Sequence, residues 1–101
     1  GWAKTKYPNG NVERKEFLQT GLMHGVTQTW YEAGQLKSEE NWHYGLPDGL
    51  WVERHENGKI LSVNYWQRGV GLIKLAWNEN GVPVKIKGWN EDGTPIAPSP
   101  G

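Results

Sequence analysis

Residues 31–51 read YEAGQLKSEENWHYGLPDGLW, and this stretch contains each element of a pattern that recurs along the 101-residue chain. It begins with a short turn that closes on a glycine, and that glycine recurs every 24 residues and then once more after 23, at Gly10, Gly34, Gly58 and Gly81. Self-similarity at a fixed period of this size is typical of repeat proteins. Such proteins usually bind other molecules through extended surfaces.

Two further columns of glycine complete each unit. One column, made of Gly25, Gly49 and Gly71, lies six residues before the residue that opens the next turn, which we take as Tyr31, His55 and Trp77. The other is Gly21, Gly45 and Gly69. Between these two columns the last unit is two residues shorter, which indicates a loop, because loops tolerate deletions. We expect Gly10, Gly34, Gly58, Gly81, Gly25, Gly49 and Gly71 to be structural turn glycines.

Each unit predicts a β-hairpin. We expect first strands over residues 12–18, 36–42 and 60–66, and second strands over residues 26–31, 50–55 and 72–77. Asn-Gly pairs at 9–10, 57–58 and 80–81 favour tight turns, since both residue types tolerate positive φ. Recurrent glycine and the lack of a 3.6-residue period argue against helices. The predicted fold is all-β, with tandem antiparallel hairpins that form an elongated, twisted sheet.

The pattern divides the chain into one repeat domain and a short tail. A partial unit over residues 1–6 precedes units at 7–30, 31–54 and 55–76, so the chain starts in mid-repeat and we expect it to be a piece of a longer array. Two half-units begin at Trp77 and Trp89, and Pro83 and Pro95 cannot donate to a sheet ladder there. We therefore expect a degenerate cap over residues 77–96, which completes a domain of residues 1–96, and a disordered tail over 97–101.

The charge balance excludes several classes of partner. Eleven basic and 11 acidic residues give a formal net charge of zero, and no basic cluster stands out. This argues against nucleic acid and makes contact with an anionic membrane unlikely to be the function. The chain has no cysteine, which excludes disulfides and thiolate metal sites and fits a cytoplasmic location.

No residue pattern predicts catalysis, a metal or a cofactor. The three histidines, His24, His43 and His55, lack the close spacing of a metal or catalytic site. The adjacent Glu39 and Glu40 would point to opposite faces of a strand, so they cannot act as an acid–base pair. The sequence contains neither a nucleophile elbow nor a phosphate-binding glycine loop with its lysine. We predict that the protein is not an enzyme.

The repeat, which is clearest from Glu39 to Trp51, resembles MORN repeats and is closest to the bacterial MORN repeat variant with its 24-residue period. The resemblance covers residues 1 to about 93, with the last units degenerate. It implies consecutive antiparallel hairpins in an elongated, twisted sheet. Many bacterial members are named YwqK-type antitoxins, which implies that they bind and silence a partner toxin. The resemblance implies no catalytic motif.

The third unit is more apolar than the first and predicts the binding site. Three positions of the first strand change from Glu13, Lys15 and Phe17 to Leu61, Val63 and Tyr65. Three positions of the second strand change from Thr27, Thr29 and Tyr31 to Ile73, Leu75 and Trp77. A single sheet exposes both faces, so a large apolar patch marks an interaction site. Either residues 82–89 fold back over this face, or a partner protein or a second copy of the chain binds there.

Three functions are consistent with these patterns. The favoured one is a protein-binding module of the antitoxin or immunity type. The seven tryptophans, most of which we expect in the repeat core, also suggest a glycan or cell-wall binding module, because Gly1-Trp2 and Gly88-Trp89 resemble the Gly-Trp of choline-binding repeats. The third is a passive structural segment of a larger protein.

Overall fold

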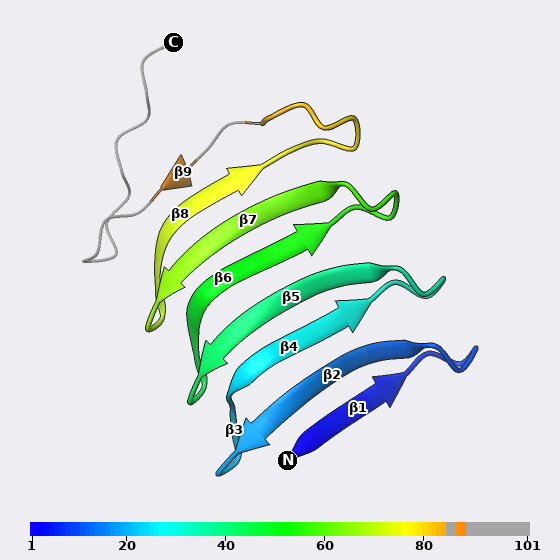
Figure 1. Cartoon of the computed structure of the whole chain (residues 1–101), viewed down its shortest axis with the longest axis vertical. Helices are drawn as coiled ribbons and strands as arrows, with labels where there is room; N and C mark the ends of the chain where they lie inside the picture. Colours follow the sequence, from blue (N-terminus) through cyan, green and yellow to red (C-terminus); the bar gives the residue numbers. More distant parts are fainter. Residues whose placement is uncertain (85–86, 89–101) are drawn as a thin grey trace.

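The computed structural model describes residues 1–84 and 87–88, which form one nine-stranded antiparallel sheet (Figure 1). Each strand pairs with its neighbour in sequence, except that the short β3 pairs with β2, and β4 follows β2 in the sheet. The predicted all-β hairpin fold is confirmed. The strands are β1 (Trp2–Lys6), β2 (Val12–Gln19), β3 (Leu22–Met23), β4 (Gly25–Trp30), β5 (Leu36–His43), β6 (Leu46–Arg54), β7 (Ile60–Gln67), β8 (Val70–Ala76) and β9 (Lys87–Gly88).

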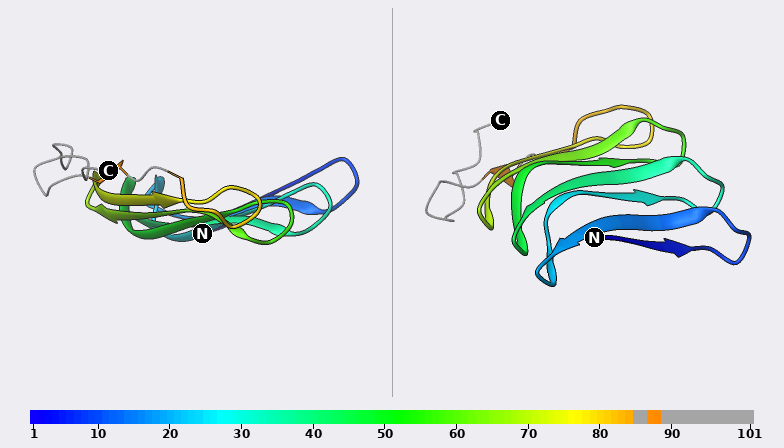
Figure 2. Two further views of the ribbon diagram at one scale, coloured as in Figure 1. Left: turned by 90° about the horizontal axis from the view of Figure 1, so that it is seen from above. Right: turned by 60° about the horizontal axis from the view of Figure 1, so that its bottom comes forward.

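The sheet is a single twisted layer with a curved profile (Figure 2). The molecule measures 47 × 36 × 14 Å, and its shortest dimension leaves no room for a second layer of secondary structure. Among the described residues no hydrophobic side chain is fully buried. The fold must therefore be held together by strand pairing and by half-buried side chains on the two faces.

The turns along one edge of the sheet are linked from unit to unit. The Tyr7 hydroxyl donates to the carbonyl oxygen of Trp30 at 2.7 Å, and the Tyr31 hydroxyl donates to that of Arg54 at 2.6 Å. The Nε2 atom of His55 lies 2.8 Å from the carbonyl oxygen of Trp77. Each side chain thus reaches the residue just before the next turn, which explains why a ring with a polar tip opens these turns.

The fourth turn opens at Asn78 and not at Trp77, as we had predicted. The amide of Gly81 donates to the carbonyl of Asn78 at 2.9 Å, as that of Gly34 does to Tyr31 and that of Gly58 to His55. The third unit is therefore one residue shorter than the others. In β8, Ile73 pairs with Tyr65 and Gly71 with Trp66, so Leu72 is an extra, bulged residue that offsets half of the two-residue deletion.

The glycine columns also differ from the prediction in part. Gly10, Gly34, Gly58 and Gly81 lie in turns with φ between +83° and +106°. The turns at the opposite edge are centred on Thr20-Gly21, Tyr44-Gly45 and Arg68-Gly69, where both residues have positive φ, as in a two-residue hairpin turn of type I′. The turn role predicted for Gly25, Gly49 and Gly71 is wrong, because these residues lie at the start of β4 and inside β6 and β8.

The described residues after the fourth turn extend the sheet at its edge. Trp77 forms a bridge with Pro83, the amide of Val84 donates to the carbonyl of Ala76 at 2.9 Å, and β9 pairs with β8. Residues 82–84 and 87–88 therefore lie beside β8 instead of covering a face of the sheet. Residues 85–86 and 89–101, which include the second predicted half-unit and the predicted tail, lie outside the described residues.

Candidate functional site

Strand pairing assigns every side chain of the central strands to one of two faces. Residues that pair across antiparallel strands share a face, and successive residues of a strand alternate between faces. One face, which we call the tryptophan face, carries Thr27, Ser38, Glu40, Trp42, Trp51, Ser62, Asn64, Trp66 and Lys74. The other, which we call the open face, carries Lys4, Lys15, Gln28, Glu39, Val52, Val63 and Leu75 in one row across the strands.

The tryptophan face is packed by its own side chains. The ring centroid of Trp51 lies 4.8 Å from that of Trp42 and 5.5 Å from that of Trp66, with interplanar angles of 50° and 48°. The indole nitrogen of Trp51 also donates to the carbonyl of Asn41 at 2.7 Å. The most buried side chains in the described chain are small polar residues of this face, Thr27, Ser38, Ser62 and Asn64. The rings touch one another at a tilt, so they present no flat platform to a ligand.

Polar groups on the tryptophan face are used internally. The guanidinium of Arg14 forms an ion pair with Glu16 at 3.0 Å, the only salt bridge among residues 1–84. The hydroxyls of Thr29 and Ser38 hydrogen-bond to each other across β4 and β5. Burial raises the pKa of the Glu40 carboxyl above its ordinary value, and the positive charge of Arg14 opposes this shift only in part. These contacts stabilise the face and leave few polar groups free for a ligand.

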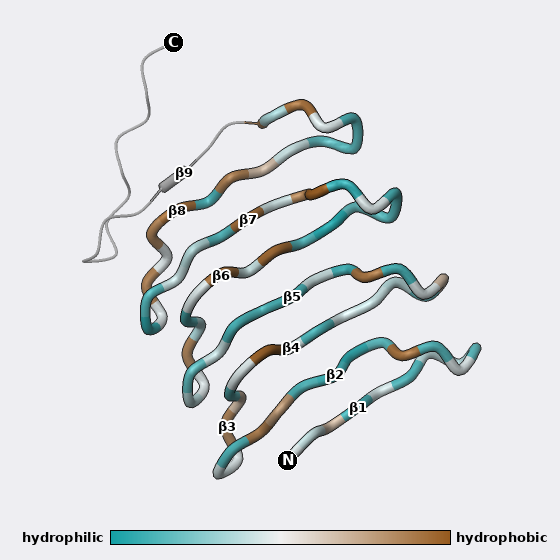
Figure 3. Tube along the Cα trace, in the orientation of Figure 1, coloured by the Kyte–Doolittle hydropathy of each residue, from teal (hydrophilic) through white to brown (hydrophobic). Residues whose placement is uncertain are grey.

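The open face carries an apolar patch over its C-terminal half. Val52, Val63 and Leu75 pair in one row, and Leu50, Tyr65 and Ile73 pair in the next. Leu61 lies on the same face, because it is two residues before Val63 in β7. The hydropathy colouring shows apolar residues along β6, β7 and β8, where β1 and β5 are mainly polar (Figure 3). We call Leu50, Val52, Leu61, Val63, Tyr65, Ile73 and Leu75 the apolar patch.

The structure brings together five of the six residues that the sequence singled out. Leu61, Val63, Tyr65, Ile73 and Leu75 share the open face, while their role in binding stays a prediction. Trp77 lies apart from them and lines a shallow hollow of about 350 Å³ together with Ile60, a residue whose alternation in β7 places it on the tryptophan face. The one-residue offset in β8 also means that Lys74 and Ala76, and not Ile73 and Leu75, take the places of Thr27 and Thr29.

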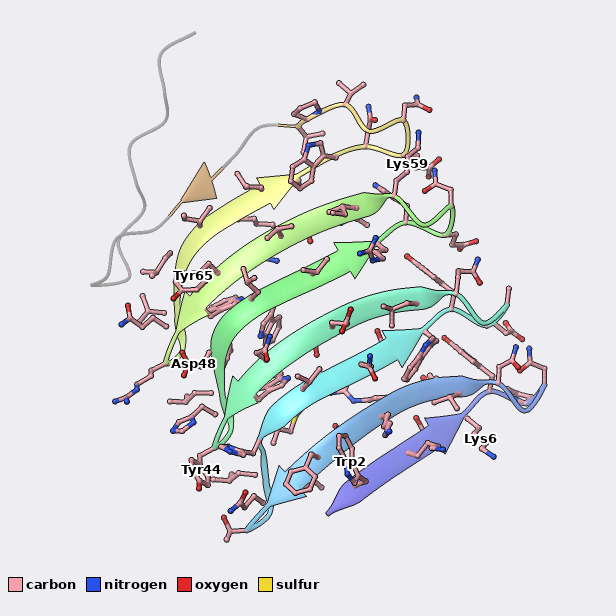
Figure 4. The ribbon with its side chains drawn as sticks, in the orientation of Figure 1. Trp2, Lys6, Tyr44, Asp48, Lys59 and Tyr65 are labelled. Carbon is pink, nitrogen blue, oxygen red and sulfur yellow. The ribbon has the colours of Figure 1, made fainter. Side chains whose placement is uncertain are left out.

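The apolar patch continues as a single line to the other end of the sheet. Trp2 pairs with Phe17, Val26 with Asn41, and Leu50 with Tyr65, which pairs in turn with Ile73. These residues follow the repeat, since Trp2, Val26 and Leu50 are 24 residues apart. The ends of the line are marked by Trp2 on β1 and Tyr65 on β7 in Figure 4. We call Trp2, Phe17, Val26, Leu50, Tyr65 and Ile73 the apolar row.

The sequence analysis missed the N-terminal half of this row, although a signal for it exists. In three units the row residue comes directly after the second glycine column, as Trp2, Val26 and Leu50. In the shortened unit the residue after Gly71 is the bulged Leu72, and the row residue is Ile73. The column is therefore broken where the patch is widest.

Lysines flank the N-terminal end of the apolar row. Lys4 pairs with Lys15 on the open face, and the Lys15 ammonium lies 4.6 Å from the ring centroid of Trp2. No ion pair involves either lysine within the described part of the chain. This end of the open face therefore combines large apolar side chains with positive charge.

The remaining titratable residues form no recognisable site among the described residues. His24, His43 and Tyr44 cluster at the hairpin edge, where the ring centroids of the two histidines lie 5.2 Å apart. His24 is occupied by a bond at 3.3 Å from the amide of Tyr44 to its Nδ1 atom. The described residues contain no group of three potential metal-ligating side chains, and they include no helix that could cross a membrane.

Two segments of the chain match the MORN repeat variant family, residues 23–44 and residues 47–67. The first spans β4 and β5 and the second spans β7 and most of β6, so each match covers two adjacent strands. Comparison with curated proteins and with solved structures gives no match. The central hairpins of this sheet are thus similar to MORN repeat variants, a type of repeat that generally serves for binding or as a structural element.

Proposed function

We propose that this chain is a non-catalytic repeat module that binds a protein partner through the apolar patch. The observation that supports this is the exposure of the patch: Leu50, Tyr65 and Ile73 retain 50%, 43% and 46% of their accessible surface, although they are neighbours on one face. A contiguous patch of this kind is uncommon on a protein that has no partner. The described C-terminal residues lie beside β8 and leave the patch uncovered.

The two faces divide the work of stability and binding in this proposal. Contacts among the tryptophans and buried small polar groups stabilise the sheet from one side. Burying the apolar patch against a partner adds hydrophobic free energy that the isolated chain cannot gain. The more specific form of the proposal is an antitoxin or immunity module, in which the partner is a toxin whose activity stops when the patch is covered.

Replacing two exposed residues of the patch tests the proposal. We expect Tyr65→Thr with Ile73→Thr to reduce capture of the partner from native lysate by at least about tenfold, because apolar anchors dominate interface free energies. Threonine suits exposed strand positions, so the sheet is retained. The measurement is quantitative mass spectrometry of the captured proteins, with circular dichroism as a check on folding.

The matched control is Leu46→Thr with Val82→Thr, two residues of similar exposure away from the patch. Capture of one stoichiometric protein by the wild type and the control, but not by the patch variant, is the expected result. Equal capture by all three folded proteins contradicts the proposal. The antitoxin form further requires that the captured protein arrests growth when expressed alone and that only chains with an intact patch restore growth.

A further inference from the structure

We propose that the apolar row binds an amphipathic α-helix of the partner, laid across the strands from β1 to β8. This inference rests on the proposed function, because it specifies the segment of the partner that the open face receives. It adds the N-terminal half of the row, Trp2, Phe17 and Val26, to the binding surface. The argument comes from the spacing of the row, from its length and from the charges beside it.

The spacing of the row fits a helix better than an extended strand. The row offers one position per strand, and adjacent strands lie about 4.8 Å apart. A helix presents an apolar side chain on one face every three to four residues, or about 5.3 Å. A strand presents one every two residues, or about 6.7 Å. A helix therefore stays nearly in step with the row, whereas a strand loses register within a few positions.

The length of the row also suits a helix. It crosses β1, β2, β4, β5, β6, β7 and β8, and the position on β5 is held by Asn41. Six steps between these strands span about 29 Å. A helix of about 19 residues covers this distance. Trp2 and Val26 retain 61% and 39% of their accessible surface, so the first half of the row is as available as the second.

The charges at one end define the chemistry of that helix. Lys4 and Lys15 lie beside Trp2 and Phe17 and form no ion pair with described residues. The row beside the C-terminal half is wholly apolar, with Val52, Val63 and Leu75. We therefore expect a helix with an apolar stripe along its length and with Asp or Glu at the end that lies over β1 and β2.

A second copy of the chain fits the open face less well. If two rows stacked with their strand order reversed, Lys15 and Lys4 would lie on Val63 and Leu75 without a carboxylate in register. If they stacked with the same strand order, Val63 would lie against Gln67 and Val52 against Asp48, which are displaced by two residues on the other side of the row. Both arrangements bury polar groups without partners, which costs free energy.

The test uses synthetic peptides of 21 residues. One has three heptads with Leu at the first and fourth positions and with Glu at the polar positions of one terminal heptad. Its control has the same composition, with Leu at every second position. We expect the helical peptide to bind at least about tenfold more tightly in fluorescence anisotropy. We also expect Trp2→Thr with Val26→Thr to weaken its binding by a similar factor, while Leu46→Thr with Val82→Thr leaves the binding unchanged.

Several outcomes overturn the inference. Equal binding of the two peptides, or a Trp2/Val26 variant that binds like the wild type, excludes a helix along the whole row. A row-dependent dimer in sedimentation, or row-dependent binding to vesicles of phosphatidylcholine and phosphatidylglycerol without helix binding, assigns the row to another occupant. If partner capture is lost with Tyr65→Thr and Ile73→Thr while the helical peptide fails to bind, the proposed function stands and the helix is wrong.

Discussion

Replacement of Trp51 by alanine is expected to lower the free energy of unfolding by about 3 kcal/mol, the largest effect of any single substitution considered for this chain. Trp51 is the middle ring of the stack on the tryptophan face, with Trp42 at 4.8 Å and Trp66 at 5.5 Å. The change also removes the hydrogen bond from its indole nitrogen to Asn41. In a sheet without a buried hydrophobic core, such a loss is a large part of the total stability.

Trp2→Ala is the matched control for this prediction. It removes the same side chain from the same sheet, but Trp2 lies on the open face and is 61% exposed. We expect it to cost less than about 1 kcal/mol, as for exposed substitutions in general. Urea unfolding followed by far-ultraviolet circular dichroism measures both variants. Similar losses for the two would contradict the assignment of the tryptophan face as the stabilising side.

Gly49→Ala is expected to lower the free energy of unfolding by about 2 kcal/mol or more. Gly49 has φ of +103° inside β6, a conformation that side chains other than glycine rarely adopt. A Cβ atom there would also lie 3.3 Å from the Cβ of Asn41, closer than ordinary van der Waals contact. The glycine column therefore reflects close packing between strands in addition to backbone conformation.

Gly10→Ala separates the two causes, because Gly10 has φ of +92° but has no atom within 4 Å of the Cβ position. We expect this control to show only the conformational cost, so that it is less destabilised than Gly49→Ala in the same urea titration. If the two variants lose equal stability, the contact between Gly49 and Asn41 contributes nothing measurable.

The hairpins and their turns could be predicted from the sequence because their signals are local. Asn-Gly pairs and glycines at positive φ set turns within four residues, and the strands fill the intervals between them. The role of Gly25, Gly49 and Gly71 could not be predicted in this way. A two-residue turn needs only the glycine of its own column, such as Gly45, and the second glycine serves the packing of neighbouring strands.

The faces of β8 could not be predicted because they depend on one bulged residue. The sequence shows a two-residue deletion between Gly69 and Gly71, but the extra residue Leu72 restores half of it only once the strand is paired with β7. A shift by one residue exchanges the faces of a strand. Alignment by Trp77 therefore placed Ile73 in the column of Thr27, whereas the structure places Lys74 there.

Thiol labelling at two adjacent residues tests the central claim, that the open face receives the partner, most directly. The chain has no cysteine, so Ile73→Cys and Lys74→Cys each introduce one thiol, at exposed positions on opposite faces of β8. We predict that both react readily in the free protein and that the captured partner slows labelling at position 73 by at least about tenfold, with little change at position 74. Protection at position 74 instead, or at neither position in a stable complex, would contradict the account.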